Sequence, residues 1–85
     1  MVKILIVEDN FFLQKALEEK LSNFSDIVIK DTAQNGEEAI AILEKNHVVD
    51  LILMDIEMPV MNGIKATEII KSKYPQIKIV MITVF

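Results

Sequence analysis

The sequence predicts one α/β domain built on a parallel sheet, in the element order βαβαβαβ. Short apolar runs alternate with segments of helical periodicity along the whole chain, and this alternation is typical of parallel strands joined by right-handed crossover helices. The hydrophobic fraction of 52% in 85 residues requires a packed core. A chain of this length supports a single domain, below the usual size of roughly 100 to 150 residues.

The first half of the chain is expected to contain two strands and two helices. Residues 2–7 form an apolar first strand, and apolar residues at helical spacing then predict a helix that ends near Asn23. Residues 27–32 alternate apolar and polar side chains, as an edge strand does. Asn35 is suited to cap a second helix, with Glu38 at the third helical position as in a capping box.

The second half is expected to contain two more strands and a third helix. Residues 49–54 are almost continuously apolar, which favours a central strand covered on both faces. Asn62 and Gly63 open the third helix, and it ends before Pro75 because the residue preceding proline is pushed out of the helical region. Residues 78–83 form the fourth strand.

Composition excludes several classes of protein. The chain has no cysteine, which removes disulfides and thiolate metal sites. Its formal net charge is −4 with dispersed charges, which argues against direct nucleic-acid binding. No apolar run approaches the ~20 residues needed to cross a bilayer, and no signal peptide is recognisable. We expect a soluble cytoplasmic domain over residues 1–85, without a membrane partner.

Oxygen-bearing side chains follow three of the predicted strands. Glu8 and Asp9 follow the first strand, Asp55 follows the third, and Thr83 ends the fourth. In open parallel sheets, ligands bind beyond the carboxyl ends of the strands. Three neighbouring carboxylates raise one another's pKa unless a cation neutralises them. Mg²⁺ fits because it takes oxygen ligands and leaves room for a phosphate oxygen. The sequence therefore predicts a magnesium site suited to phosphoryl chemistry.

These residues, in this order, resemble the receiver domain of two-component response regulators. The family pattern is matched by an acidic pair, a phosphoacceptor, a Met-Pro-x-Met-x-Gly turn and a switch hydroxyl, at Glu8, Asp9, Asp55, Met58, Pro59, Met61, Gly63 and Thr83. The segment Asp-Ile-Glu-Met-Pro-Val-Met-Asn-Gly, followed later by Ile-Thr-Val-Phe, most resembles the corresponding segments of receivers attached to helix-turn-helix transcription factors.

The resemblance implies that Asp55 accepts a phosphoryl group from a sensor histidine kinase, or from a small donor such as acetyl phosphate. Mg²⁺ would be bound by Asp9, Asp55 and the backbone carbonyl of Glu57, with Glu8 acting through water. Thr83 would donate its hydroxyl to a phosphoryl oxygen. Positioning and electrostatics supply most of the catalysis in phosphoryl transfer, and the domain is expected to be a phosphoacceptor switch, not an enzyme.

The chain is shorter than the family pattern. Receivers resemble the flavodoxin-like class with strand order 2-1-3-4-5, whereas this sequence supplies strands for the order 2-1-3-4 only. We expect a partial receiver, a truncated form or fragment of a transcriptional regulator, without the fourth helix, the fifth strand and the fifth helix. The family lysine after the fifth strand would be missing, and losing one such group costs roughly 3 kcal/mol. Phosphorylation from small donors is therefore expected to be slow.

The fourth strand also predicts self-association. An uncovered strand of this kind pairs readily with other chains, so we expect a homodimer or swapped assembly through it. The alternative to signalling is an interaction or oligomerisation module that retains the receiver motif. A magnesium-dependent phosphatase with an aspartyl nucleophile is disfavoured, because its Asp-x-Asp signature would follow the first strand and Glu8-Asp9-Asn10 does not match.

Three other side chains carry expectations. His47 is expected to lie in a surface loop, neither a ligand nor a phosphodonor. Phe11 and Phe12 begin the first helix beside the acidic pair. Family analogy makes this neighbourhood a kinase-docking face, and one of the two rings is expected in the core.

Overall fold

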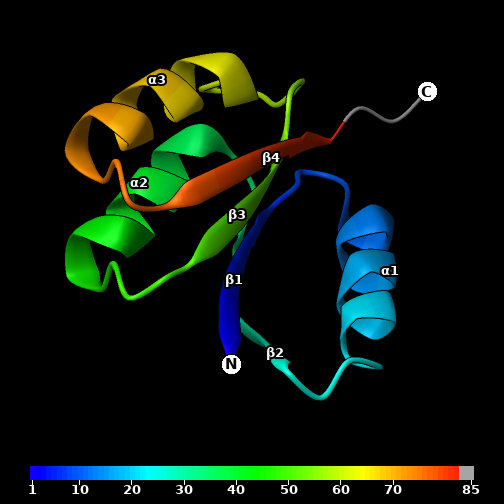
Figure 1. Cartoon of the computed structure of the whole chain (residues 1–85). Coiled ribbons are helices and arrows are strands. Elements are labelled where there is room, and N and C mark those ends of the chain that lie inside the picture. Colours follow the sequence, from blue (N-terminus) through cyan, green and yellow to red (C-terminus); the bar gives the residue numbers. More distant parts are fainter. Residues whose placement is uncertain (83–85) are drawn as a thin grey trace.

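The computed structural model describes residues 1–82 and contains a four-stranded parallel sheet with helices on both faces (Figure 1). The strands are β1 (Val2–Val7), β2 (Ile27–Ala33), β3 (Leu51–Asp55) and β4 (Lys78–Ile82). The helices are α1 (Phe11–Leu21), α2 (Gly36–Lys45) and α3 (Gly63–Lys73). The strand order β2-β1-β3-β4 confirms the predicted class and topology.

Element boundaries differ slightly from the sequence expectations. Strand β3 begins at Leu51, two residues later than predicted. The Asp50 carboxylate accepts the Lys3 N–H at 2.8 Å, and its own N–H is donated to the Lys3 carbonyl at 2.8 Å. Helix α1 ends at Leu21, before the predicted Asn23. The end of the fourth strand at Thr83 lies outside the described residues.

Each helix begins at an asparagine whose side chain accepts a backbone N–H three residues ahead. Asn10 accepts from Leu13 at 3.1 Å, and Asn35 accepts from Glu38 at 2.8 Å. Asn62 caps α3 in the same way at 2.9 Å. Such caps stabilise a helix by roughly 1 kcal/mol each. They fix the three helix N-termini beside the carboxyl ends of the strands.

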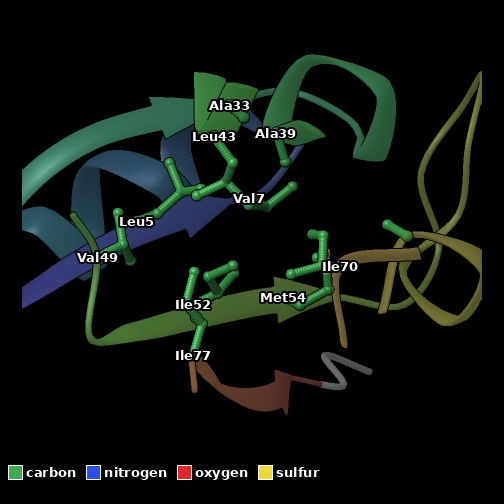
Figure 2. Packing of buried hydrophobic residues seen from close by; sticks show 11 residues of the cluster. Leu5, Val7, Ala33, Ala39, Leu43, Val49, Ile52, Met54, Ile70 and Ile77 are labelled. Atoms are coloured by element: carbon green, nitrogen blue, oxygen red, sulfur yellow. The ribbon is translucent and has the colours of Figure 1, made fainter. Parts of the chain in front are cut away.

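The main core lies between the sheet and the α2–α3 layer (Figures 1 and 2). Alternation along β1 sends Leu5 and Val7 to this side and Ile4 and Ile6 to the side of α1. Figure 2 shows side chains of β1, β3, α2 and α3 meeting in one layer, including Leu5, Val7, Leu43, Ile52, Met54 and Ile70. This layer holds the ends of β1 and β3 side by side.

The opposite face of the sheet carries α1 alone (Figure 1). A groove of about 250 Å³ runs between α1 and the end of β4, lined by Glu8, Leu13, Ala16, Leu17, Lys20 and Ile82. Strand β4 is one of the two edges of the described sheet, and Val80 is 47% exposed on it. Within residues 1–82, no helix is both long and apolar enough to cross a membrane.

Candidate metal centre

The three predicted carboxylates meet at the carboxyl ends of β1 and β3. These strands are adjacent and parallel, with Val7 in register with Met54, which places Glu8 beside Asp55. Asp9 follows in the turn before α1. One carboxylate oxygen from each of Glu8, Asp9 and Asp55 lies within 4.8 Å of the others. The arrangement offers a hard cation three oxygen ligands from two chain segments.

Glu8 is the buried member of this group, with 2% of its surface exposed. Burial, together with the neighbouring carboxyl groups of Asp9 and Asp55, raises the pKa of Glu8 to about 7. The Asn10 N–H, donated to Glu8 Oε2 at 3.0 Å, partly offsets this effect. The hydrogen bond from Asn10 holds the Glu8 carboxylate in place, and the negative charge of this buried group is unfavourable without a cation.

Asp55 is half-buried and Asp9 is exposed, so the group opens to solvent on their side. Burial raises the pKa of Asp55, and the charge of Asp9 raises it further. Hydrogen bonds from the Glu8 carboxyl and the Ile56 N–H act in the opposite direction. The net effect is a raised pKa, so the charged form of Asp55 is unfavourable without a neighbouring cation.

No lysine among residues 1–82 forms an ion pair with this acidic group. The lysine ion pairs of that region join Lys15 to Glu18, Lys65 to Glu68 and Lys73 to Glu44. A divalent cation with oxygen preference fits the three acidic side chains, because it takes carboxylate ligands and keeps waters in its remaining positions. The donor set suits Mg²⁺ better than a softer metal.

Two other groups predicted for the site are the Glu57 carbonyl and the Thr83 hydroxyl. Glu57 lies two residues beyond Asp55 in the loop between β3 and α3, with an exposed side chain. Its backbone carbonyl stays a predicted ligand. Thr83 lies outside the described residues, so its switch role also stays a prediction.

The loop between β3 and α3 is fixed by backbone contacts. The Gly63 N–H is donated to the Ile56 carbonyl at 2.8 Å, which closes the loop at its base. The Gly36 N–H is donated to the Met61 carbonyl at 3.1 Å, which ties the loop to α2. Val60 has φ 68°, and the Met61 N–H reaches across it to Pro59 at 2.7 Å, as in a tight three-residue turn. The Met-Pro-x-Met-x-Gly motif thus shapes the loop that follows Asp55.

Neither phenylalanine at the start of α1 lies in the core, so the expectation that one does is wrong. Phe11 is 59% exposed and Phe12 is 81% exposed. The rings pack edge to face at 5.9 Å, and Lys15 lies 5.4 Å from the Phe11 ring centre. The buried residue of α1 is instead Gln14, which sequence reasoning missed. His47 is exposed in a loop as predicted and stacks on Tyr74.

Comparison with known proteins decides the family. The sequence model described as "Response regulator receiver domain" matches residues 4–85. The chain belongs to the response regulator receiver family. The transcriptional regulatory protein LnrK of Bacillus subtilis is 38% identical to this receiver domain over 85 residues, which cover the whole chain and 38% of LnrK. The domain thus spans about two fifths of that relative's length.

Solved structures agree with this assignment. A chain of the CheX–CheY–BeF3–Mg²⁺ complex from Borrelia burgdorferi superimposes with a TM-score of 0.92 at 30% identity, covering 99% of the receiver domain and 63% of that chain. A DNA-binding response regulator of the LuxR family from Staphylococcus aureus gives a TM-score of 0.89 at 28% identity, covering 100% and 70%. The predicted resemblance to receivers of transcriptional regulators is confirmed.

Proposed function

We propose that this receiver domain accepts a phosphoryl group on Asp55 from a sensor histidine kinase in the cytoplasm, with Mg²⁺ bound at the acidic group. The observation that carries the proposal is the approach of Glu8, Asp9 and Asp55 to within 4.8 Å of one another. The raised pKa values of Glu8 and Asp55 support it, because they indicate a site that favours a cation. The resemblance to a chain from a complex described with BeF3 and Mg²⁺ also supports it.

In the proposed step, a carboxylate oxygen of Asp55 attacks the phosphorus of a phosphohistidine. The new O–P bond forms as the P–N bond breaks, and the imidazole nitrogen keeps the electron pair. Mg²⁺, when bound, neutralises charge on the carboxylates and on the phosphoryl oxygens. Asp9, Asp55 and the Glu57 carbonyl are the proposed direct ligands, Glu8 acts through water, and Thr83 donates to the phosphoryl group. The domain serves as a phosphoacceptor in the relay of a transcriptional regulator.

The test is phosphorylation of the chain by a phosphorylated histidine kinase and, separately, by acetyl phosphate, each with Mg²⁺ or with EDTA. We expect an acid-stable, base-labile phosphoryl group that forms only with Mg²⁺. Formation from acetyl phosphate should be slow, because no lysine of residues 1–82 pairs with the acidic group. Equal labelling in EDTA would exclude the proposed metal role.

The second candidate is an interaction or oligomerisation module. The groove between α1 and β4, together with the exposed Val80, favours this use. We propose a homodimer or swapped assembly in which β4 or its flanking apolar face is covered by a second copy. Sedimentation should show a dimer at high micromolar concentration that Val80→Lys weakens. A stable monomer under these conditions would rule the assembly out. Dimerisation unchanged by Asp55→Asn, without phosphorylation of the wild type, would favour this candidate.

The raised pKa values predict how stability depends on pH without metal. The folded pKa of Glu8 is about 7 and its ordinary value is 4.5, so the folded state holds more protons than the unfolded state between these values. Stability is therefore highest below pH 4.5 with respect to this group and falls as pH rises to 7, by about 3 kcal/mol. Asp55, whose pKa is also raised, contributes with the same sign.

Urea denaturation at several pH values, in EDTA and in Mg²⁺, measures this dependence. Mg²⁺ should restore stability most at the higher pH, because it binds the deprotonated carboxylates. The matched variant Glu8→Gln has no proton to lose, and its metal-free stability should fall much less. Metal-free stability that rises between pH 5 and pH 7 in the wild type, but not in Glu8→Gln, would contradict the assignment.

A further inference from the structure

We infer that Gln14 is a positioning residue that holds the acidic pair Glu8 and Asp9 in place for the cation. Gln14 lies in α1 and is 8% exposed, although its neighbours on the helix are partly or fully exposed. Its amide Nε2 is donated to the Glu8 carbonyl at 3.3 Å and to the Ala33 carbonyl at 3.4 Å. One side chain thus joins the helix to the ends of β1 and β2.

The two acceptors belong to a closed set of hydrogen bonds around Glu8. The Glu8 N–H is donated to the Ala33 carbonyl at 2.9 Å, which is also an acceptor of Gln14. The Glu8 carboxylate accepts the Asn10 N–H at 3.0 Å, and the Asn10 carbonyl accepts the Gln14 N–H at 2.9 Å. Glu8 is therefore held at its N–H, its carbonyl and its carboxylate.

The Glu8 carbonyl matters for the cation because it belongs to the peptide that joins Glu8 to Asp9. Rotation of this peptide would move the Asp9 side chain relative to Asp55. Gln14 restrains that rotation from the buried side, whereas Asp9 itself is exposed. Groups that orient metal ligands without touching the metal contribute substantially to affinity.

The choice of side chain also favours a positioning role over simple packing. A buried amide is unfavourable unless it is hydrogen-bonded, and a methionine of similar length would fill the same space without that cost. Both bonds of Gln14 are long for N–H···O contacts. Their contribution to overall stability is therefore expected to be small.

The inference rests on the proposed function only for the identity of the cation, so the experiment measures the pair with and without metal. Amide NMR signals of Asp9 and Asp55 are followed during Mg²⁺ titration of the full chain. Metal-free hydrogen exchange is then recorded at the Glu8 and Asn10 amides. Gln14→Met should raise the Kd for Mg²⁺ about tenfold and accelerate exchange at both amides.

Glu19→Gly is the control. Glu19 is exposed on the same helix, so glycine there weakens α1 without a direct effect on the acidic pair. It should leave the Kd and both exchange rates close to those of the wild type. If Gln14→Met does not fold, Gln14→Asn replaces it, since it keeps the amide but is too short to reach both carbonyls.

Several results would overturn the inference. The first is a folded Gln14 variant whose Kd for Mg²⁺ and amide exchange rates at Glu8 and Asn10 stay within about twofold of the wild type. A positioning group should change the affinity more than this. Equal changes in Glu19→Gly would overturn it too, because they would reflect helix stability alone. If the wild type binds no Mg²⁺, the proposed function fails, and the exchange at Glu8 and Asn10 still decides whether Gln14 holds the pair.

Discussion

Asp55→Asn is expected to abolish stable phosphorylation of this receiver domain while leaving it folded. The amide has no anionic oxygen to attack phosphorus, and it is a weaker ligand for a hard cation than a carboxylate is. We expect a loss of at least about 10³-fold, down to background labelling, with a kinase donor or with acetyl phosphate. Phosphate-affinity electrophoresis or radiolabel transfer measures the loss directly.

The stability of the same variant separates loss of the acceptor from loss of the fold. Removing the Asp55 charge relieves one cause of the raised pKa of Glu8. Metal-free Asp55→Asn should therefore be at least as stable as the wild type above pH 7, the value that the pKa of Glu8 approaches. A variant that is folded, more stable and unphosphorylated places the acceptor at Asp55.

Glu37→Gln is the matched control, since it removes the same charge from an exposed position in the first turn of α2. It should be phosphorylated at the wild-type rate to within about twofold, as surface substitutions away from a site have small effects. Undiminished, base-labile labelling of Asp55→Asn would show that another carboxylate, such as Asp9, is the acceptor.

The acidic group was predictable because its positions follow from chain order. An acidic residue at the end of an apolar strand lies at the carboxyl end of a parallel sheet. This argument holds for Glu8 and for Asp55. Adjacency of β1 and β3, which brings the two together, was expected only from the resemblance to receivers. The register of Val7 with Met54 then sets their separation.

The environment of α1 was not predictable from its periodicity. A helical stripe indicates which positions face the sheet but not how much of the sheet lies beneath them. Leu13 and Leu17 line an open groove and are only partly buried, while Gln14 is enclosed. A polar residue beside an apolar stripe usually faces solvent, so nothing in the helical pattern indicated that Gln14 donates hydrogen bonds to two strand ends.

The loop after Asp55 shows a second limit, because its shape depends on contacts between distant residues. The bond from Gly36 to Met61 joins residues on different elements. Val60 has a positive φ, which β-branched residues rarely adopt. Local propensity therefore argues against the observed turn, and the surrounding contacts impose it.

Gly63→Ala is expected to destabilise the domain severely, although alanine is the better helix former. Gly63 is the first residue of α3, and an added Cβ would overlap the backbone carbonyl oxygen of Asp55. The same Cβ would lie 3.0 Å from the Asp55 carbonyl carbon and from Met54 Cγ. Because the obstacle is backbone in a central strand, it cannot turn aside as a side chain does. We expect a loss of about 3 kcal/mol, at the upper end of overpacking effects.

Urea denaturation followed by circular dichroism, with Ser72→Ala as control, measures this loss. Ser72 is exposed on the same helix, so its replacement raises helix propensity without approaching β3, and the domain should be unchanged or slightly more stable. Stability of Gly63→Ala equal to that of the wild type would show that α3 can move away from β3 without cost. Relief of the overlap otherwise requires the Asp55 carbonyl, which the added Cβ would meet, to move. The fraction of Gly63→Ala that folds should also bind Mg²⁺ more weakly than the wild type. This result would connect the close packing of Gly63 against the Asp55 carbonyl to the position of the phosphoacceptor.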